Sequence, residues 1–80
     1  MADLVLITRQ GCCLCEGLEE KLRALALPLE LRDVDRDPVL QARYGQEVPV
    51  LLLSGRELPR VSPRLGLDAL RRWLQQQGVD

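Results

Sequence analysis

The chain contains no histidine and no phenylalanine, and it has one tyrosine and one tryptophan among its 80 residues. The lack of histidine excludes Cys-His and Ser-His nucleophilic pairs in this chain, as well as metal sites built on imidazole. Because aromatic residues are so scarce, aliphatic side chains, above all leucine, must form the core. The formal net charge is −1, so the composition shows no electrostatic footprint for nucleic acid.

Long apolar segments are also missing. The longest apolar runs, residues 4–7 and 48–53, are far shorter than the roughly 20 residues of a membrane-spanning helix. The N-terminus has neither the basic region nor the apolar region of a secretory signal. We therefore expect a cytoplasmic protein that contacts no membrane, in a compartment where thiols are kept reduced. The length predicts a single domain over residues 1–80, and we expect a monomer.

All the cysteines of the chain lie close together, in Gly11-Cys12-Cys13-Leu14-Cys15. Cysteines this close in sequence cannot tie distant segments together, so we expect any disulfide among them to be local and functional. A Cys-x-x-Cys pair between a strand and a helix is typical of thiol–disulfide exchange.

The apolar pattern alternates between strand and helix periods along the chain. Asp37-Pro38 is a typical helix start, and Gly45 a typical helix stop. Strands are predicted over residues 3–8, 29–34, 48–53 and 56–58, and helices over residues 14–27, 37–44 and 67–77. The strand–helix–strand opening implies a parallel pair with a right-handed crossover, and the two-residue Ser54-Gly55 turn implies an antiparallel closing pair. The predicted fold class is α/β, in the order βαβαββα, with helices on both faces of a four-stranded mixed sheet.

The two outer cysteines differ in their predicted surroundings. Cys12 lies where the first helix begins, so unpaired backbone N–H groups and the helix dipole favour its thiolate, and Arg9 adds a positive charge. Glu16 opposes this effect, so the expected lowering of the Cys12 pKa is moderate. Cys15 shares the apolar helix face with Leu18 and is expected to be buried. This asymmetry predicts that Cys12 attacks a disulfide and that Cys15 resolves the mixed disulfide.

Other interpretations of the cysteines stay open. They are consistent with small buried hydrophobic residues, as free cysteines often are. Three thiolates are also consistent with metal binding: zinc would need a fourth ligand, for which the chain has no histidine or further cysteine, whereas Cu(I) accepts few soft ligands. Cys13 is interpreted as an exposed bystander.

Two segments resemble motifs of small glutaredoxin-like proteins of the thioredoxin-fold superfamily. They are Thr8-Arg9-Gln10-Gly11-Cys12-Cys13-Leu14-Cys15-Glu16 and Val48-Pro49-Val50, and the similarity runs through nearly the whole chain. The resemblance implies a thioredoxin-like, glutaredoxin-like fold with Cys12 as nucleophile and Cys15 as resolving thiol. It also implies a cis-proline at Pro49, and a substrate-binding site that includes Arg9, Gly11, Val48 and Pro49. In such proteins the residue at the place of Arg9 holds a glutathione carboxylate.

The chain departs from the glutaredoxin pattern around this site. Cys13-Leu14 stands between the cysteines in place of Pro-Tyr, and Glu47 replaces the threonine before Val48-Pro49. The segment 59–63 replaces a Gly-Gly kink and the aspartate that follows it. Arg56, Arg60 and Arg64 form a basic stretch that is either a solvated edge or a site for an acidic partner or glutathione.

The function that these features predict is that of a thiol–disulfide oxidoreductase, which reduces protein disulfides or glutathione mixed disulfides. No tightly bound cofactor and no metal are expected, and glutathione is expected as a co-substrate. The partners would be a disulfide-bearing protein or glutathione, with a reductase or glutathione as electron donor. The alternatives are a redox-inactive or thiol-sensing interaction module of the same fold and a metal-thiolate carrier.

Overall fold

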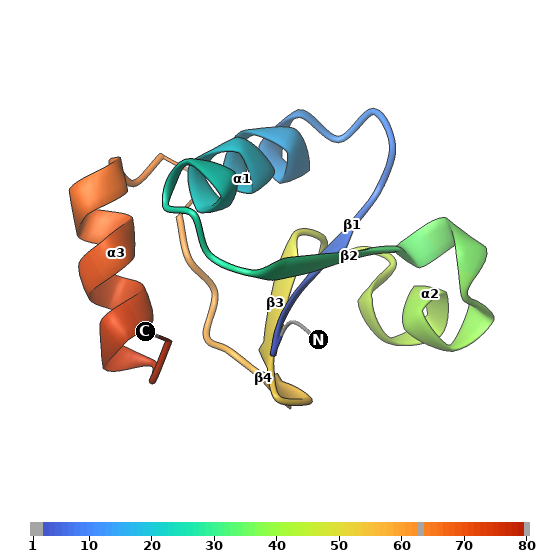
Figure 1. Ribbon diagram of the computed structural model, residues 1–80. Coiled ribbons are helices and arrows are strands. Elements are labelled where there is room, and N and C mark those ends of the chain that lie inside the picture. Colours follow the sequence, from blue (N-terminus) through green and yellow to red (C-terminus); the bar gives the residue numbers. More distant parts are fainter. Residues whose placement is uncertain (1–2, 63, 80) are drawn as a thin grey trace.

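The computed structural model describes residues 3–62 and 64–79, and this part of the chain forms one four-stranded sheet with three α-helices (Figure 1). A short 3₁₀ helix, η1, precedes the second α-helix. The elements are β1 (Leu4–Thr8), α1 (Cys13–Ala24), β2 (Leu29–Asp33), η1 (Val34–Arg36), α2 (Pro38–Tyr44), β3 (Val50–Leu53), β4 (Arg56–Glu57) and α3 (Leu67–Gln76). None of the described helices is both long and apolar enough to span a membrane.

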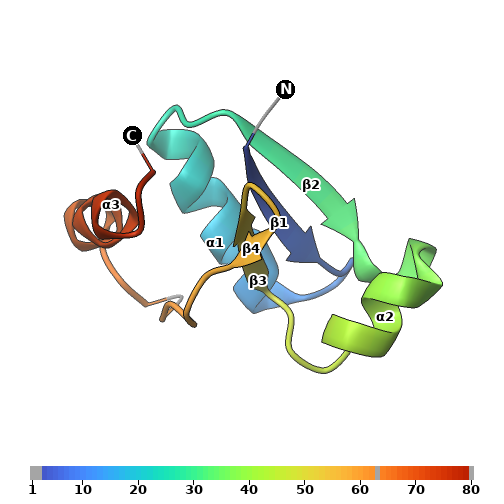
Figure 2. The same ribbon diagram turned by 90° about the horizontal axis from the view of Figure 1, so that it is seen from below.

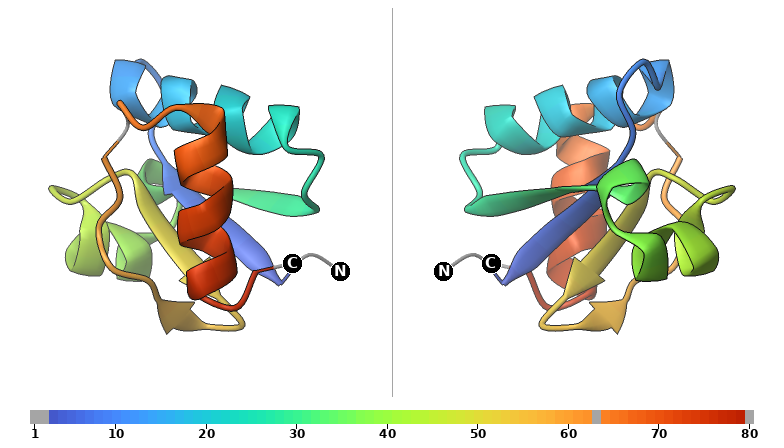
Figure 3. Two further views of the ribbon diagram at one scale, coloured as in Figure 1. Left: turned by 90° about the vertical axis from the view of Figure 1, so that its left-hand side faces the viewer. Right: turned by 90° about the vertical axis from the view of Figure 1, so that its right-hand side faces the viewer.

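The strands are arranged in the order β2-β1-β3-β4. β1 pairs in parallel with β2 and antiparallel with β3, and β3 pairs antiparallel with β4. Figure 2 shows α1 and α3 on one side of this sheet and α2 on the other. Figure 3 shows that α1 and α3 run in different directions across the same face of the sheet. The predicted fold class, a mixed α/β sheet with helices on both faces, is confirmed.

Alternation along β1 and β3 divides the core into two layers. One layer packs the sheet against α1 and α3, and the other packs it against η1 and α2. The first layer contains Leu4, Leu6, Leu18, Leu22, Leu51, Leu58, Leu70, Leu74 and Val79. The second contains Ile7, Val34, Tyr44 and Val50. Among the described residues, no polar or charged side chain is buried, so aliphatic packing holds the fold together as expected.

Several boundaries differ from those predicted. β3 begins at Val50 and not at residue 48, since Pro49 has no N–H to donate to a strand partner. η1 was not predicted. Gly45 does end α2, but with a right-handed φ of −54°, and a Cβ there would lie 2.5 Å from the Gln41 carbonyl oxygen. The irregular segment expected after β4 includes Pro63, which lies outside the described residues.

Ala26 takes the left-handed conformation after α1 that glycine usually supplies. Its φ is +59°, and its N–H donates to the Arg23 carbonyl over 2.9 Å. A Cβ in this region costs about 1–2 kcal/mol, and glycine would remove that cost. Glycine also loses more conformational entropy on folding, which cancels part of the gain. We expect Ala26→Gly to raise the free energy of unfolding by about 0.5–1 kcal/mol. Urea unfolding followed by Trp73 fluorescence measures it.

Ala24→Gly is the matched control, because Ala24 is also exposed and is the last residue of α1 itself. There the same substitution is expected to lower the free energy of unfolding by up to about 1 kcal/mol. Destabilisation by both substitutions alike would contradict the left-handed assignment of Ala26.

Candidate active site

Three strand ends meet at one edge of the sheet and position the candidate site. Thr8, the last residue of β1, pairs in parallel register with Asp33, the last residue of β2. On the other side, Ile7 lies opposite Val50 in antiparallel register, which places Pro49 beside the same end of β1. The loop that carries the cysteines leaves the sheet from this edge.

A tight turn leads from β1 into α1. The N–H of Cys12 donates to the carbonyl oxygen of Arg9 over 3.3 Å, and Gly11 has a positive φ of +78°. Glycine adopts this conformation without steric cost, so the chain can reverse here before the helix begins. Cys12 is the N-cap of α1, as the sequence predicted for its place at the helix start.

Cys12 and Cys15 form a disulfide across the first turn of α1, with their Cα atoms 5.2 Å apart. The backbone N–H of Cys15 donates to Cys12 Sγ over 3.2 Å. Cys15 is fully buried, whereas Cys12 is only half-buried. Because a donor aimed at sulfur favours the anion, and Cys12 is partly exposed whereas Cys15 is fully buried, Cys12 is the better placed nucleophile.

The middle residues of the motif point outward. Cys13 is free and exposed, and Leu14 is 57% exposed. Cys13 therefore has neither the N-cap position of Cys12 nor the burial of Cys15. Within residues 3–62 and 64–79, no group of three or more His, Cys, Asp or Glu side chains is arranged to hold a metal ion.

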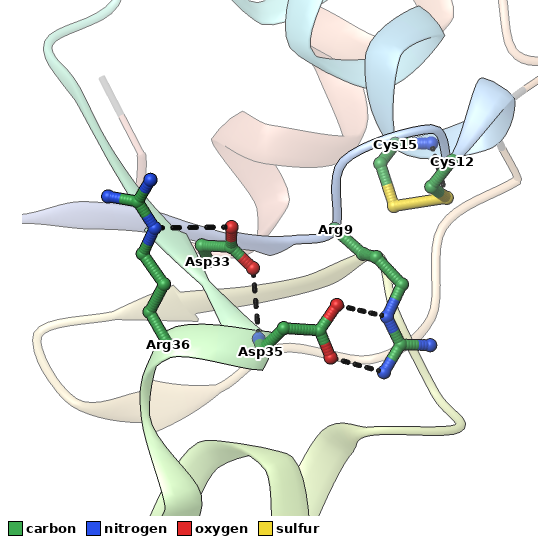
Figure 4. Close-up of polar contacts among 6 residues, drawn as sticks. All are labelled: Arg9, Cys12, Cys15, Asp33, Asp35 and Arg36. Atoms are coloured by element: carbon green, nitrogen blue, oxygen red, sulfur yellow. Dashed lines mark hydrogen bonds and ion pairs between the residues drawn. A yellow bond between two sulfur atoms is a disulfide. The ribbon is translucent and has the colours of Figure 1, made fainter.

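Arg9 is bound to Asp35, a residue outside the site that the sequence predicts. Arg9 Nε and Nη2 donate to the two carboxylate oxygens of Asp35 over 2.9 and 3.0 Å. The hydrogen bond to Asp35 raises the pKa of Arg9, so the guanidinium stays charged. Figure 4 shows the Arg9 side chain pointing toward Asp35 and not toward the disulfide.

A sequence signal for Asp35 did exist. Asp33 ends β2, and its carboxylate accepts a hydrogen bond from the Asp35 N–H over 2.9 Å, which caps η1. Since β1 and β2 are parallel, acidic residues just after β2 lie beside residues just after β1. The Asp33-x-Asp35 spacing at the end of the predicted second strand therefore indicates carboxylates close to Arg9.

Val48 and Pro49 immediately precede β3 and are joined by a cis peptide bond. Val48 packs against the α2 side of the core, while Pro49 lines a small cavity of ≈ 30 Å³ with Leu18 of α1. Arg60 also lines this cavity, and its Nη2 donates to the carbonyl oxygen of Glu47 over 3.0 Å. Pro49 thus shares a cavity with the α1 residue one turn beyond Cys15.

The basic stretch after β3 is partly engaged within the protein. Besides the contact of Arg60 with Glu47, Arg56 Nη2 donates to the carbonyl oxygen of Gln77 over 3.1 Å. Arg60 thus connects its loop to the segment before β3, and Arg56 connects β4 to the C-terminal end of α3.

The fold and the Cys12–Cys15 disulfide at the β1–α1 junction define a thiol-redox fold of the thioredoxin-like class. Residues 3–75 match the family model of the glutaredoxin-like domain (DUF836), and the chain belongs to this family. The resemblance inferred from the motifs is thereby confirmed.

Solved structures and curated proteins agree with this assignment. The chain is 37% identical to target protein XcR50 from X. campestris, with 95% of each chain covered and a TM-score of 0.70. A mutant thioredoxin from Halobacterium salinarum is 28% identical, covering 94% of this chain and 74% of that one, with a TM-score of 0.63. A protein of Mycobacterium tuberculosis is 38% identical over an alignment of 61 positions, and the match covers 65% of this chain. The match spans 63% of that relative, less than two thirds of its length.

Proposed function

We propose that this protein is a thiol–disulfide oxidoreductase that reduces protein disulfides or glutathione mixed disulfides. The observation that carries the proposal is the Cys12–Cys15 pair: Cys12 is a half-buried residue at a helix N-cap, and Cys15 is fully buried one turn away. A nucleophile must be reachable by substrate, whereas a resolving thiol must reach only the nucleophile. The burial of the two cysteines matches these different requirements.

The reaction begins with loss of the Cys12 thiol proton. The thiolate attacks one sulfur of the substrate disulfide, forming a mixed disulfide and releasing the other sulfur as a thiolate, which takes up a proton. The Cys15 thiol then loses its proton and attacks Cys12 Sγ, and the second substrate sulfur leaves as a thiol. The substrate gains two electrons, and the protein is left with the Cys12–Cys15 disulfide.

Two electrons from a reductase or from glutathione return the protein to its dithiol form. Glutathione therefore serves as a co-substrate, and the cycle needs no tightly bound cofactor. Arg9, Gly11, Val48 and Pro49 are proposed to bind the substrate. In support, Arg9 and Gly11 follow the end of β1, and Val48 and Pro49 precede Val50, which pairs with Ile7 of β1. A reducing compartment such as the cytoplasm suits this cycle.

Trapping of the mixed disulfide tests the proposal. With Cys15→Ser, a disulfide substrate such as insulin or oxidised glutathione is expected to remain attached to Cys12, because the resolving thiol is gone. Intact-mass and peptide mass spectrometry measure the adduct. Cys13→Ser serves as the matched control, since it removes a neighbouring thiol but keeps the pair; it should accumulate no adduct.

Two outcomes would overturn the proposal. If Cys15→Ser forms no adduct on Cys12 with any disulfide, the chain is a redox-inactive interaction module. If the adduct forms on Cys13, the assignment of the nucleophile is wrong.

A further inference from the structure

Arg9 is the positively charged residue of the turn that leads to Cys12. Its guanidinium, however, is hydrogen-bonded to the carboxylate of Asp35. The two hydrogen bonds of 2.9 and 3.0 Å join the edge of the guanidinium to both oxygens of the carboxylate. Such fork-to-fork contacts are the strongest and most directional that arginine makes. Arg9 comes from the loop after β1 and Asp35 from η1 after β2, so the sheet fixes their approach.

Asp35 is itself held in place. Its backbone N–H is bound to the Asp33 carboxylate, and Asp33 also lies 3.8 Å from Arg36 Nε. Figure 4 shows this chain of charges running from Arg36 to Arg9 beneath the disulfide. The four side chains carry two positive and two negative charges, so the cluster is neutral as a whole.

The Arg9–Asp35 pair is open to solvent, with side chains 35% and 45% exposed. Because the backbone of Arg9 and Cys12 shares one turn, a substrate at Cys12 experiences the field of an ion pair and not that of a free cation. A free Arg9 would attract an anionic disulfide to Cys12, but the carboxylate of Asp35 compensates that charge and competes for the same N–H groups. The ion pair thus affects which substrates react fastest with Cys12. Its contribution to the stability of the fold is small, because the pair is exposed.

We propose that Asp35 is a specificity-determining residue, which withholds Arg9 from anionic substrates and so shifts the selectivity of Cys12 toward neutral disulfides. This inference rests on the proposed disulfide chemistry of Cys12. The site would therefore discriminate between substrates by their charge. The substrate class that it favours is a disulfide without carboxylates close to the sulfur atoms.

The test compares small disulfides of different charge. In a Cys13→Ser background, reduced protein is mixed with dithiodiglycolate, which is anionic, or with bis(2-hydroxyethyl) disulfide, which is neutral, and the rates of oxidation are measured by stopped flow. Asp35→Asn is expected to raise the anionic-to-neutral rate ratio about three- to fivefold at low salt, and less at high salt.

Asp33→Asn is the matched control. It removes one negative charge two residues away, and its amide oxygen can still accept the hydrogen bond from the Asp35 N–H. It leaves the bonds between Arg9 and Asp35 in place, so we expect a clearly smaller change in the ratio. Equal effects of the two substitutions would mean that only net charge matters, and they would overturn the proposal.

A double-mutant cycle isolates the role of Arg9. In an Arg9→Gln background, Asp35→Asn is expected to change the rate ratio no more than Asp33→Asn does in the unaltered chain. If Asp35→Asn has its full effect without Arg9, the guanidinium is not the group that Asp35 controls, and the proposal fails.

Alkylation separates this inference from the proposed function. Iodoacetate and iodoacetamide both react with the Cys12 thiolate, which displaces iodide, but only iodoacetate is anionic. Asp35→Asn should raise the iodoacetate-to-iodoacetamide ratio about threefold even if no disulfide is ever reduced. An unchanged alkylation ratio overturns the role of Asp35, whereas absence of any reaction with disulfides overturns the oxidoreductase instead.

Discussion

Cys12→Ser is expected to lower the rate of disulfide reduction by about 1,000-fold or more. The hydroxyl that replaces the thiol does not attack disulfides at neutral pH. The N-cap of α1 is the position where the Cys15 N–H meets the attacking sulfur, and neither remaining cysteine occupies it. The measurement is the rate of insulin reduction with dithiothreitol as electron donor, or of oxidised glutathione reduction in an NADPH-coupled assay.

Two sister variants act as controls for that result. Cys13→Ser should stay within about twofold of the unaltered protein, because Cys13 is exposed and unbonded. Cys15→Ser should still attack once but lose turnover on protein disulfides. If Cys13→Ser loses as much activity as Cys12→Ser, the exposed thiol is the nucleophile and the assignment of Cys12 is wrong.

Leu22→Ala is expected to lower the free energy of unfolding by about 3–4 kcal/mol. Leu22 is fully buried where α1 packs on the sheet, and the smaller side chain would leave a cavity in an almost entirely aliphatic layer. Small domains have total stabilities of only about 5–15 kcal/mol, so this loss is a large share. Urea unfolding of the reduced protein, followed by Trp73 fluorescence, measures it.

Leu14→Ala is the matched control, because it makes the same chemical change in the same helix at a side chain that is 57% exposed. We expect it to change the free energy of unfolding by no more than about 0.5 kcal/mol. Similar losses for both variants would contradict the packing of α1 against the sheet.

Much of the fold follows from local patterns that need no knowledge of distant contacts. The helical spacing of Cys15, Leu18 and Leu22 identifies the buried face of α1, and all three side chains are buried. Asp37 caps α2 through its carboxylate, which accepts hydrogen bonds from the N–H groups of Val39 and Leu40. Such signals are contained within one or two turns of chain, so the sequence predicts them well.

Contacts between particular side chains far apart in the sequence were not predicted. Arg9 and Asp35 lie 26 positions apart, and they meet because β1 and β2 end side by side. From the sequence, Arg9 is predicted only as a positive charge near Cys12, whereas in the structure its guanidinium is bound to Asp35. Arg60 reaches the backbone before Val48 in the same way, from a loop with no periodic pattern. Ala26 shows that a left-handed position need not carry glycine.

The most direct test of the central claim is an equilibrium redox titration of the protein with and without the Cys13→Ser substitution. The protein is equilibrated in dithiothreitol buffers of graded potential, its thiols are alkylated, and the modified peptides are quantified by mass spectrometry. We expect one reversible two-electron transition, in which Cys12 and Cys15 lose their thiols together. The ratio of dithiol to disulfide protein should change tenfold for about 30 mV. The Cys13→Ser variant should show the same transition. A pair that never oxidises together, or a disulfide that includes Cys13, would contradict the assignment of Cys12 and Cys15 as the working pair.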